Sequence, residues 1–222
     1  KHCSVRPCMP RRMLVAMQME EFMTRRYELR FNRMKGCKEY RERHSLFTDY
    51  RPVTAEAVKS ICFEAQLEGI SAIEYDVQRY VDSRRVSHYW PIEEFLFDLP
   101  HWDGQDRIRA LADCVPCENK EWRDFFYIWF LSMVAHWLQM DREHANSTSP
   151  LLVGPQGCRK SSFCQSLLPP ELRPYYVDGI DLGSRKDAEM ALNRFALINL
   201  DEFDSIPASR QPYLKNLLQK AK

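Results

Sequence analysis

The spacing of hydrophobic positions before residue 141 predicts helices with one β-hairpin among them. The first helix covers 11–24, where Met13, Met17 and Phe22 fall near one face and are interpreted as core filler. A β-hairpin is expected over about 27–42, because apolar and charged residues alternate on both sides of a glycine turn. Further helices are expected over about 55–68, 73–82, 91–97, 106–114 and 121–140.

Two of these helices carry additional signals. Thr54 is a typical N-cap for the helix that follows it, and Ala57, Ile61 and Ala65 form the inward stripe of that helix. The helix over 121–140 contains large aromatic rings at helical spacing. Such a run is most simply a buried helix packed on the next domain, and no contact with a membrane is expected.

The rest of the chain alternates strands with helices after a short polar stretch at 141–149. This stretch is the best internal boundary. It separates a helical N-terminal region with the hairpin, residues 1–145, from a core over residues 146–222. Strands are expected at 150–153, 175–177 and 195–200, with helices from about 160, 185 and 208. Strand–helix alternation of this kind predicts an α/β fold whose parallel sheet has helices on both faces.

An apolar run breaks into a glycine loop at residues 151–162, which read Leu-Leu-Val-Gly-Pro-Gln-Gly-Cys-Arg-Lys-Ser-Ser. This is the outline of a phosphate-binding P-loop, because Gly154 and Gly157 let backbone N–H groups turn inward. Lys160 adds a positive charge for the β- and γ-phosphates, and Ser161 offers a hydroxyl to Mg²⁺. The candidate nucleotide-binding residues are Gly154, Pro155, Gln156, Gly157, Cys158, Arg159, Lys160, Ser161 and Ser162.

A second motif supports the loop. The apolar run over 195–200 ends in two carboxylates, Asp201 and Glu202, and Asp201 follows Lys160 by 41 positions. An Asp at the end of a buried strand beside a P-loop is placed to hold Mg²⁺ together with Ser161, and Glu202 is the candidate to orient or deprotonate the attacking water. The alternative is a buried strand followed by a helix that Asp201 caps, which explains the carboxylates but not the glycine loop.

Arg159 departs from the usual P-loop pattern, which has Gly directly before the Lys. Glycine is favoured there because the backbone passes close to the phosphates and can need a conformation that a β-carbon resists. Arg159 either crowds the site or adds a cation to the phosphate contacts, since Arg binds phosphate well. The sequence leaves both possibilities open, and an altered but working loop is the preferred interpretation.

The composition is that of a packed globular protein. Of 222 residues, 45% are hydrophobic and 28% are charged, with a net charge of +1. No stretch approaches the ~20 apolar residues that span a membrane, and the first residues do not resemble a signal peptide, so a cytoplasmic location is expected. Cys114 and Cys117 form a lone CxxC pair, which is interpreted as structural rather than as a zinc or redox site.

Contact with DNA would require local clustering of positive charge, because the chain as a whole is nearly neutral. Acidic residues are mixed among the basic ones near the hairpin, so an ordinary solvated face is favoured over a phosphate-binding one. The basic residues of this cluster are Arg25, Arg26, Arg30, Arg33, Lys35 and Lys38.

The combination of motifs resembles the virulence-associated protein E family. The resemblance rests on residues 97–107 with their Trp-Asp-Gly at 102–104, on the aromatic helix, on the glycine loop, and on Ile-Asn-Leu-Asp-Glu-Phe at 198–203. The hairpin is similar to the opening of that family's domain. Members are P-loop ATPase domains of phage and mobile-element proteins, often fused after a primase domain, and are similar to superfamily 3 helicases of the AAA+ type.

The resemblance implies ATP and Mg²⁺ as cofactors. Lys160 and Ser161 match the family's Walker A positions, and Asp201 and Glu202 match its Walker B positions. It also implies a ring of identical subunits that acts on DNA. The polar sensor, the arginine finger and a strand between the two Walker strands would lie past Lys222. We therefore expect a fragment with an incomplete sheet, an open sheet edge and weak or no turnover.

Two other functions compete with an ATP-hydrolysing module of a primase/helicase. The first is a nucleotide-switched module that binds DNA or a protein partner with little turnover, and Arg159 favours it. The second is a small-molecule kinase, which is weaker because the chain before the loop is a long helical region with no evident acceptor pocket.

Overall fold

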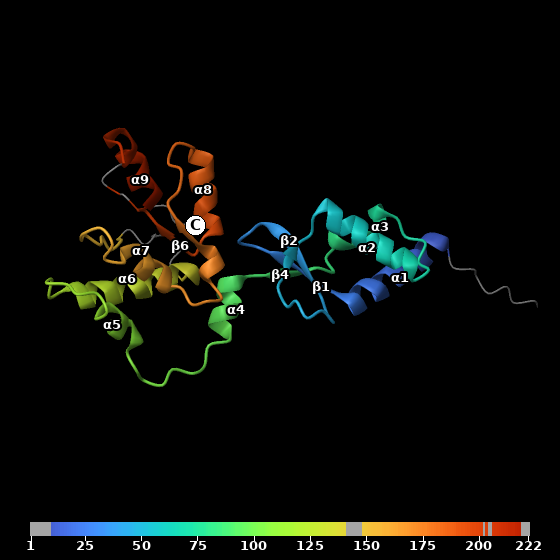
Figure 1. The fold of residues 1–222 in the computed structure, drawn as a ribbon, viewed down its shortest axis with the longest axis horizontal. Coiled ribbons are helices and arrows are strands. Elements are labelled where there is room, and N and C mark those ends of the chain that lie inside the picture. Colours follow the sequence, from blue (N-terminus) through green and yellow to red (C-terminus); the bar gives the residue numbers. More distant parts are fainter. Residues whose placement is uncertain (1–9, 141–147, 202, 204–205, 219–222) are drawn as a thin grey trace, which may run out of the picture. The chain divides into compact units, whose positions relative to one another are not determined.

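The predicted hairpin lies at the centre of a four-stranded sheet (Figure 1). The computed structural model describes residues 10–140, 148–201, 203 and 206–218. The chain forms two compact units, which divide between Trp90 and Pro91. The first unit contains α1 (Arg11–Arg26), β1 (Tyr27–Asn32), β2 (Cys37–Glu42), β3 (Arg51–Pro52), α2 (Ala55–Leu67), α3 (Glu74–Val81) and β4 (Ser87–Tyr89).

The sheet of the first unit has the strand order β3-β2-β1-β4. β1 and β2 are antiparallel with Tyr27 opposite Glu42, and Gly36 turns between them at a φ of 66°, which confirms the hairpin. β4 pairs with β1 in parallel, and β3 pairs with β2 antiparallel. The sequence did not predict β3 and β4, because strands of two or three residues are too short to show a period.

Three helices pack against one face of this sheet. Thr54 Oγ1 accepts a hydrogen bond from the N–H of Ala57 at 3.2 Å, so the predicted cap of α2 is confirmed. Ile61 and Ala65 of α2 are buried, as expected from their spacing. These side chains share one core with Tyr27 from the sheet, and Figure 1 shows α1, α2 and α3 beside that sheet.

The inward face of α1 differs from the prediction. Met13 and Met17 are 53% and 52% exposed and do not fill the core. The buried residues of α1 are Val15, Met19, Phe22 and Met23. Positions 15, 19, 22 and 23 recur at spacings of three and four residues and form a single stripe, whereas Met13 and Met17 lie on the opposite side of the helix, away from the core.

The second unit is mixed α/β and is built around one aromatic helix. Its elements are α4 (Pro91–Phe97), α5 (Arg107–Ala112), α6 (Trp122–Trp137), α7 (Lys160–Ser166), β5 (Tyr176–Asp178), α8 (Arg185–Arg194), β6 (Leu197–Asn199) and α9 (Gln211–Leu218), with 3₁₀ turns at Arg173–Tyr175 and Ala208–Arg210. Because β5 and β6 are parallel, they need a crossover, and α8 provides it.

The core of the second unit forms along α6, as the aromatic run predicted. Phe126, Trp129 and Met133 are buried, and they share a cluster with Leu167, which follows α7. Trp137 Nε1 donates a hydrogen bond to the carbonyl oxygen of Ala196 at 2.9 Å, which ties the end of α6 to the start of β6. The aromatic helix therefore anchors the strand that leads to the candidate carboxylates.

The strand predicted at 150–153 is absent, and this prediction was wrong. These residues have no ladder partner among the described residues, and Leu151 and Val153 are 67% and 88% exposed. An apolar run becomes a strand only where a neighbouring strand completes its hydrogen bonds. The described parallel sheet of this unit consists of β5 and β6 alone, so the larger sheet of a P-loop nucleoside triphosphatase is not seen.

The predicted domain boundary near residue 145 lies between two helices that share one core. Side chains of α6 and Leu167 belong to the same cluster, on opposite sides of that boundary. The division into residues 1–145 and 146–222 stays a prediction. Within the described part of the chain, none of the helices has the length and apolar content that crossing a membrane requires.

Candidate functional site

The glycine loop leads from the extended residues 150–153 into α7, with two residues in the left-handed region. Gly157 has a φ of 82°, and Arg159 has a φ of 65° and a ψ of 28°. A β-carbon on Gly154 would lie 3.2 Å from Cys158 Sγ. Because its φ is positive, the backbone at Arg159 has a conformation that favours glycine, and a side chain with a β-carbon there carries a cost of about 1–2 kcal/mol.

Lys160 folds back over this loop. Its Nζ donates hydrogen bonds to the carbonyl oxygens of Gly154 at 2.9 Å and Pro155 at 3.0 Å, and it lies 3.7 Å from Cys158 Sγ. The ammonium group thus lies against the concave side of the turn and is held by neutral acceptors. An anionic oxygen is a stronger acceptor for an ammonium group than a peptide carbonyl, so a phosphate can replace these contacts.

Ser161 and Asp201 meet although 40 positions separate them. Ser161 Oγ donates a hydrogen bond to Asp201 Oδ2 at 3.0 Å. Ser161 lies in the first turn of α7, and Asp201 follows the end of β6 by two residues. The hydroxyl of the first motif and the carboxylate of the second, which the sequence placed in one metal site, are therefore direct neighbours.

The remaining predicted site residues lie around this pair. Pro155, Gln156 and Ser162 are exposed on the loop and the first turn of α7. Glu202, the residue expected to orient the attacking water, lies outside the described residues. The loop, Lys160, Ser161 and Asp201 are thus assembled in one place, and the position of the expected base stays a prediction.

A further carboxylate at this edge was missed by the sequence analysis. Asp178 ends β5 and pairs in register with Asn199 at the end of β6. The thiol of Cys164 on α7 has a raised pKa because of burial, and the negative charges of Asp178 and Asp201 raise it further. The available signal was an Asp at the end of a strand-length apolar run, which is the same signal that identified Asp201.

Among the described residues, the other cysteines and acidic groups do not form a recognisable metal centre. Cys114 and Cys117 are both exposed. In the part of the chain that the structure describes, no group of three or more His, Cys, Asp or Glu side chains is arranged to hold a metal ion. A magnesium site in a P-loop does not depend on such a group, because Mg²⁺ keeps several waters and takes ligands from the phosphates.

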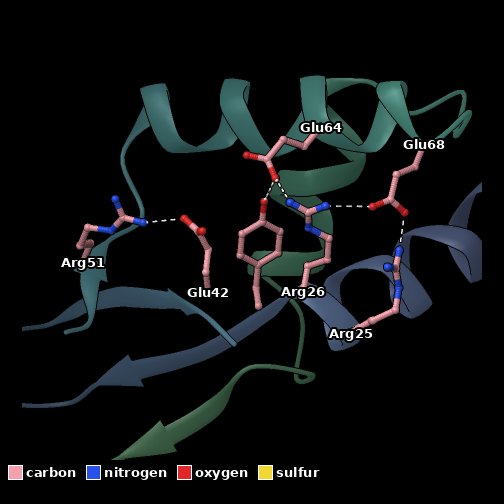
Figure 2. A network of polar contacts seen from close by, with 7 residues as sticks. Arg25, Arg26, Glu42, Arg51, Glu64 and Glu68 are labelled. Atoms are coloured by element: carbon pink, nitrogen blue, oxygen red, sulfur yellow. Dashed lines mark hydrogen bonds and ion pairs between the residues drawn. The ribbon is translucent and has the colours of Figure 1, made fainter. Parts of the chain in front are cut away.

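The basic cluster near the hairpin is largely neutralised by carboxylates. Arg26 Nη2 lies 2.9 Å from Glu64 and its Nη1 lies 3.1 Å from Glu68, which also pairs with Arg25 (Figure 2). Lys38 pairs with Asp82. These guanidinium and ammonium groups tie α1 and the sheet to α2 and α3, as an internal polar network would.

The rest of the cluster lies on β1 and on the turn that follows it. Arg30 and Lys35 each contact Glu39 at 2.9 Å, while Arg33 contacts His88 Nδ1 at 3.0 Å. Arg30 also stacks between the rings of Tyr50 and Tyr89, with its guanidinium carbon 3.5 and 3.6 Å from the ring centroids. The mixed charges predicted an ordinary solvated face, and the structure adds that these basic groups are paired within the unit; contact with DNA stays untested.

The segment before α5 is fixed by local polar contacts. Arg107 donates to both carboxylate oxygens of Asp103 at 2.6 and 2.7 Å, and these bonds hold the pKa of Asp103 well below its usual range. Asp106 accepts from the N–H of Arg109 at 3.0 Å and caps α5. Trp102 itself is 78% exposed. This Trp-Asp-Gly turn therefore orients the start of α5 by hydrogen bonds rather than by burial.

The fold and the assembled loop define a mixed α/β protein with a glycine loop, a lysine and a Ser–Asp pair at the edge of a small parallel sheet. The family model of the virulence-associated protein E-like domain matches residues 96–222, and the chain belongs to this family. The match begins within α4 and covers every residue of the candidate site. Membership associates the chain with proteins of mobile genetic elements. A comparison with curated proteins gave no match.

Proposed function

We propose that the chain binds ATP with Mg²⁺ at the glycine loop, as a P-loop module. The observation that carries the proposal is the hydrogen bond between Ser161 and Asp201, next to a loop that Lys160 closes. A strand-and-cap interpretation of Asp201 gives no reason for its carboxylate to meet a serine 40 positions away. The order of the two motifs along the chain and this contact support the same assignment.

The donor set fits Mg²⁺. Ser161 Oγ and Asp201 Oδ2 are hard oxygen atoms 3.0 Å apart, close enough for both to approach one small cation. Ser161 and Asp201 are the residues that would hold the ion, directly or through water. When bound, Mg²⁺ supplies charge neutralisation at the phosphates.

The other residues of the loop would bind and orient the triphosphate. Lys160 exchanges the carbonyl oxygens of Gly154 and Pro155 for phosphate oxygens, while the N–H groups of the turn face the anion. Arg159 stands at the same turn and adds a second positive charge. Glu202, which directly follows Asp201 in the sequence, is proposed to orient the water that attacks the terminal phosphate.

At the level of the whole protein, we propose an ATP-hydrolysing module of a mobile-element DNA primase/helicase. Family membership supports this proposal, together with the Walker-type site, for a superfamily 3-like enzyme that works as a homo-oligomeric ring on DNA in the cytoplasm. Positioning and charge stabilisation would drive hydrolysis, because phosphoryl transfer needs little covalent help from the protein.

A second candidate function is a nucleotide-operated switch that binds DNA or a protein partner with little turnover. The left-handed backbone of Arg159 favours this second function. Strain stored in a phosphate loop changes when a nucleotide binds, so binding is linked to the conformation of the loop. A DNA-binding assay with ATP and with a non-hydrolysable analogue separates the two functions. If the analogue supports every activity that ATP supports, the switch is the better account.

The first test is binding of a fluorescent ATP analogue with Mg²⁺ to the chain and to Lys160→Ala. Loss of a charged hydrogen-bond donor is expected to weaken binding by about 10- to 100-fold. Lys186→Ala removes an exposed lysine of α8 and serves as the matched control, with binding unchanged. Far-UV circular dichroism establishes that all three proteins are folded. Absence of binding by the folded parent chain would contradict the proposal.

A further inference from the structure

The last residues of β5 and β6 are joined by two hydrogen bonds, and a third within β5 supports them. Tyr176 Oη donates to Asp178 Oδ1 at 2.6 Å, and Asn199 Nδ2 donates to the same oxygen at 2.9 Å. The N–H of Gly179 donates to the carbonyl oxygen of Asn199 at 2.6 Å. One carboxylate oxygen thus accepts from a side chain on each strand, directly beside a backbone bond between them.

These contacts stabilise one end of a very small sheet. β5 and β6 are three residues each, and every residue of β6 is only half-buried. A two-stranded sheet of this size is marginal by itself, so its ends separate unless other contacts hold them. The start of β6 is held by Trp137 Nε1, which donates to Ala196 O at 2.9 Å. Asp178 provides the corresponding contact at the other end.

The end of β6 determines where the candidate cation ligand lies. Asp201 follows Asn199 by two residues, in the turn directly after β6, so its position depends on where the end of β6 lies. A shift of Asn199 would therefore displace Asp201 from Ser161 Oγ.

We infer that Asp178 is a positioning residue of the proposed site: through Asn199 it fixes the carboxyl end of β6 and so holds Asp201 beside Ser161. The inference rests on the proposed function, because the role of the Ser161–Asp201 pair in holding Mg²⁺ is part of that proposal. A carboxylate suits this position because a charged acceptor makes shorter and stronger hydrogen bonds than a neutral one.

The test uses the 222-residue chain and three substitutions. Asp178→Ala removes the acceptor, Asp178→Asn keeps an acceptor oxygen without the charge, and Glu171→Gln removes an exposed charge of the same unit as the control. The first readout is the Mg²⁺ concentration that gives half of the magnesium-dependent increase in binding of the fluorescent ATP analogue. Residues that orient metal ligands affect metal affinity by about 10- to 100-fold when removed.

For Asp178→Ala we expect this Mg²⁺ concentration to rise about 10-fold, with a smaller rise for Asp178→Asn and none for Glu171→Gln. Binding of the analogue in EDTA is expected to stay within about 2-fold, because Lys160 and the loop are untouched. A merely structural role of Asp178 would weaken both kinds of binding equally. An unchanged Mg²⁺ requirement in folded Asp178→Ala overturns the inference.

The second readout is hydrogen exchange without any ligand. Removing Asp178 is expected to lower the protection factor of the Gly179 amide by about 10-fold, while the Ala196 amide, which donates to Tyr175 O at 2.7 Å at the other end of β6, keeps its protection. This readout separates two failures. If the parent chain binds no nucleotide and Gly179 still loses protection, the proposed function fails and the contact stands. Unchanged protection at Gly179 overturns the inference by itself.

Discussion

The two compact units differ in how their polar side chains are satisfied. In the first unit, Glu39 is 1% exposed and accepts hydrogen bonds from Arg30, Asn32 and Lys35. In the second unit, Lys160 is held by two carbonyl oxygens of its own loop, at the edge of a small sheet. The charged side chain of the first unit is paired with other side chains, whereas Lys160 in the second unit is held by backbone carbonyl oxygens, which under the proposed function are exchanged for phosphate oxygens.

The two units also differ in how their buried apolar clusters are built. The first unit buries a continuous cluster from α1, α2, α3 and the sheet. The second unit buries the aromatic face of α6, while Leu151 and Val153 beside the glycine loop stay exposed. Exposed apolar residues also occur in the first unit, where Leu46 and Phe47 are 98% and 80% exposed, so the contrast lies in the buried clusters.

The largest effect on the contrast between the two units is expected from removing Phe126, the central buried ring of the second unit. Phe126→Ala is expected to destabilise that unit by about 3–5 kcal/mol, because the buried ring contacts Trp122, Trp129, Phe130 and Phe163. Its neighbour Phe125 is 54% exposed, so Phe125→Ala is the matched control, with a loss of about 1 kcal/mol or less. Urea denaturation followed by hydrogen exchange measures both losses and assigns them to a unit.

If the two units are separate in stability, Phe126→Ala leaves the exchange of amides in α1 and α2 unchanged. Equal acceleration in both units would show that they unfold together. The contrast drawn between them would then describe contacts and not independent structures.

A smaller effect is expected from the fixed charges of the first unit. Glu39→Gln is expected to cost about 2–3 kcal/mol, because a buried carboxylate with three donors is replaced by a neutral amide that cannot accept from all of them. Glu42 pairs with Arg51 on the surface, so Glu42→Gln is the control, with a change within about 1 kcal/mol. Thermal denaturation of both variants measures the difference.

Glu39 also makes the stability of the first unit depend on pH under acidic conditions. Burial opposes ionisation of Glu39, but hydrogen bonds from Lys35, Asn32 and Arg30 outweigh it, so the pKa of Glu39 is lowered. A pKa that is lower in the folded state contributes stability above the unfolded value of about 4.3, and this contribution is lost as the pH falls through the folded value. Stability between about pH 5 and pH 3 should therefore fall less steeply in Glu39→Gln than in the parent chain. Parallel curves would contradict this role.

Local signals explain why much of the fold was predictable. The cap at Thr54, the turn at Gly36 and the aromatic stripe of α6 depend on neighbours along the chain, and each was found where the sequence indicated. The pair Ser161–Asp201 was predictable for a different reason, since two motifs in a known order carry information about a distant contact. Met13 and Met17 were wrongly grouped with Phe22 on one face, because at about 100° per residue they lie on the opposite side of the helix from Phe22.

The errors share a physical cause. Residues 150–153 have the composition of a strand, but a strand also needs a partner, and no local pattern states whether one is present. Asp178 escaped notice because its importance lies in hydrogen bonds to Tyr176 and Asn199, of which the second crosses between strands. Contacts that depend on a neighbouring strand are set by topology, and the sequence alone did not provide that topology.

The smallest expected effect concerns the residue at which the chain departs from the usual loop. Arg159→Gly is expected to stabilise the second unit by about 0.5–1 kcal/mol, because a left-handed conformation that an arginine adopts at a cost is natural for glycine. Gln139 also has a positive φ, of 54°, and lies outside the loop, so Gln139→Gly is the matched control with a similar gain. Thermal denaturation measures both.

Nucleotide binding then separates strain from charge at this position. Both substitutions relieve a left-handed residue, but only Arg159→Gly removes a positive charge from the loop. If that charge contacts phosphate, Arg159→Gly gains stability and binds the ATP analogue more weakly than Gln139→Gly does. If Arg159 crowds the loop, Arg159→Gly binds more tightly, and the departure from the usual pattern is a handicap that the rest of the site tolerates. Equal gains in stability with equal binding would place Arg159 outside the phosphate contacts altogether.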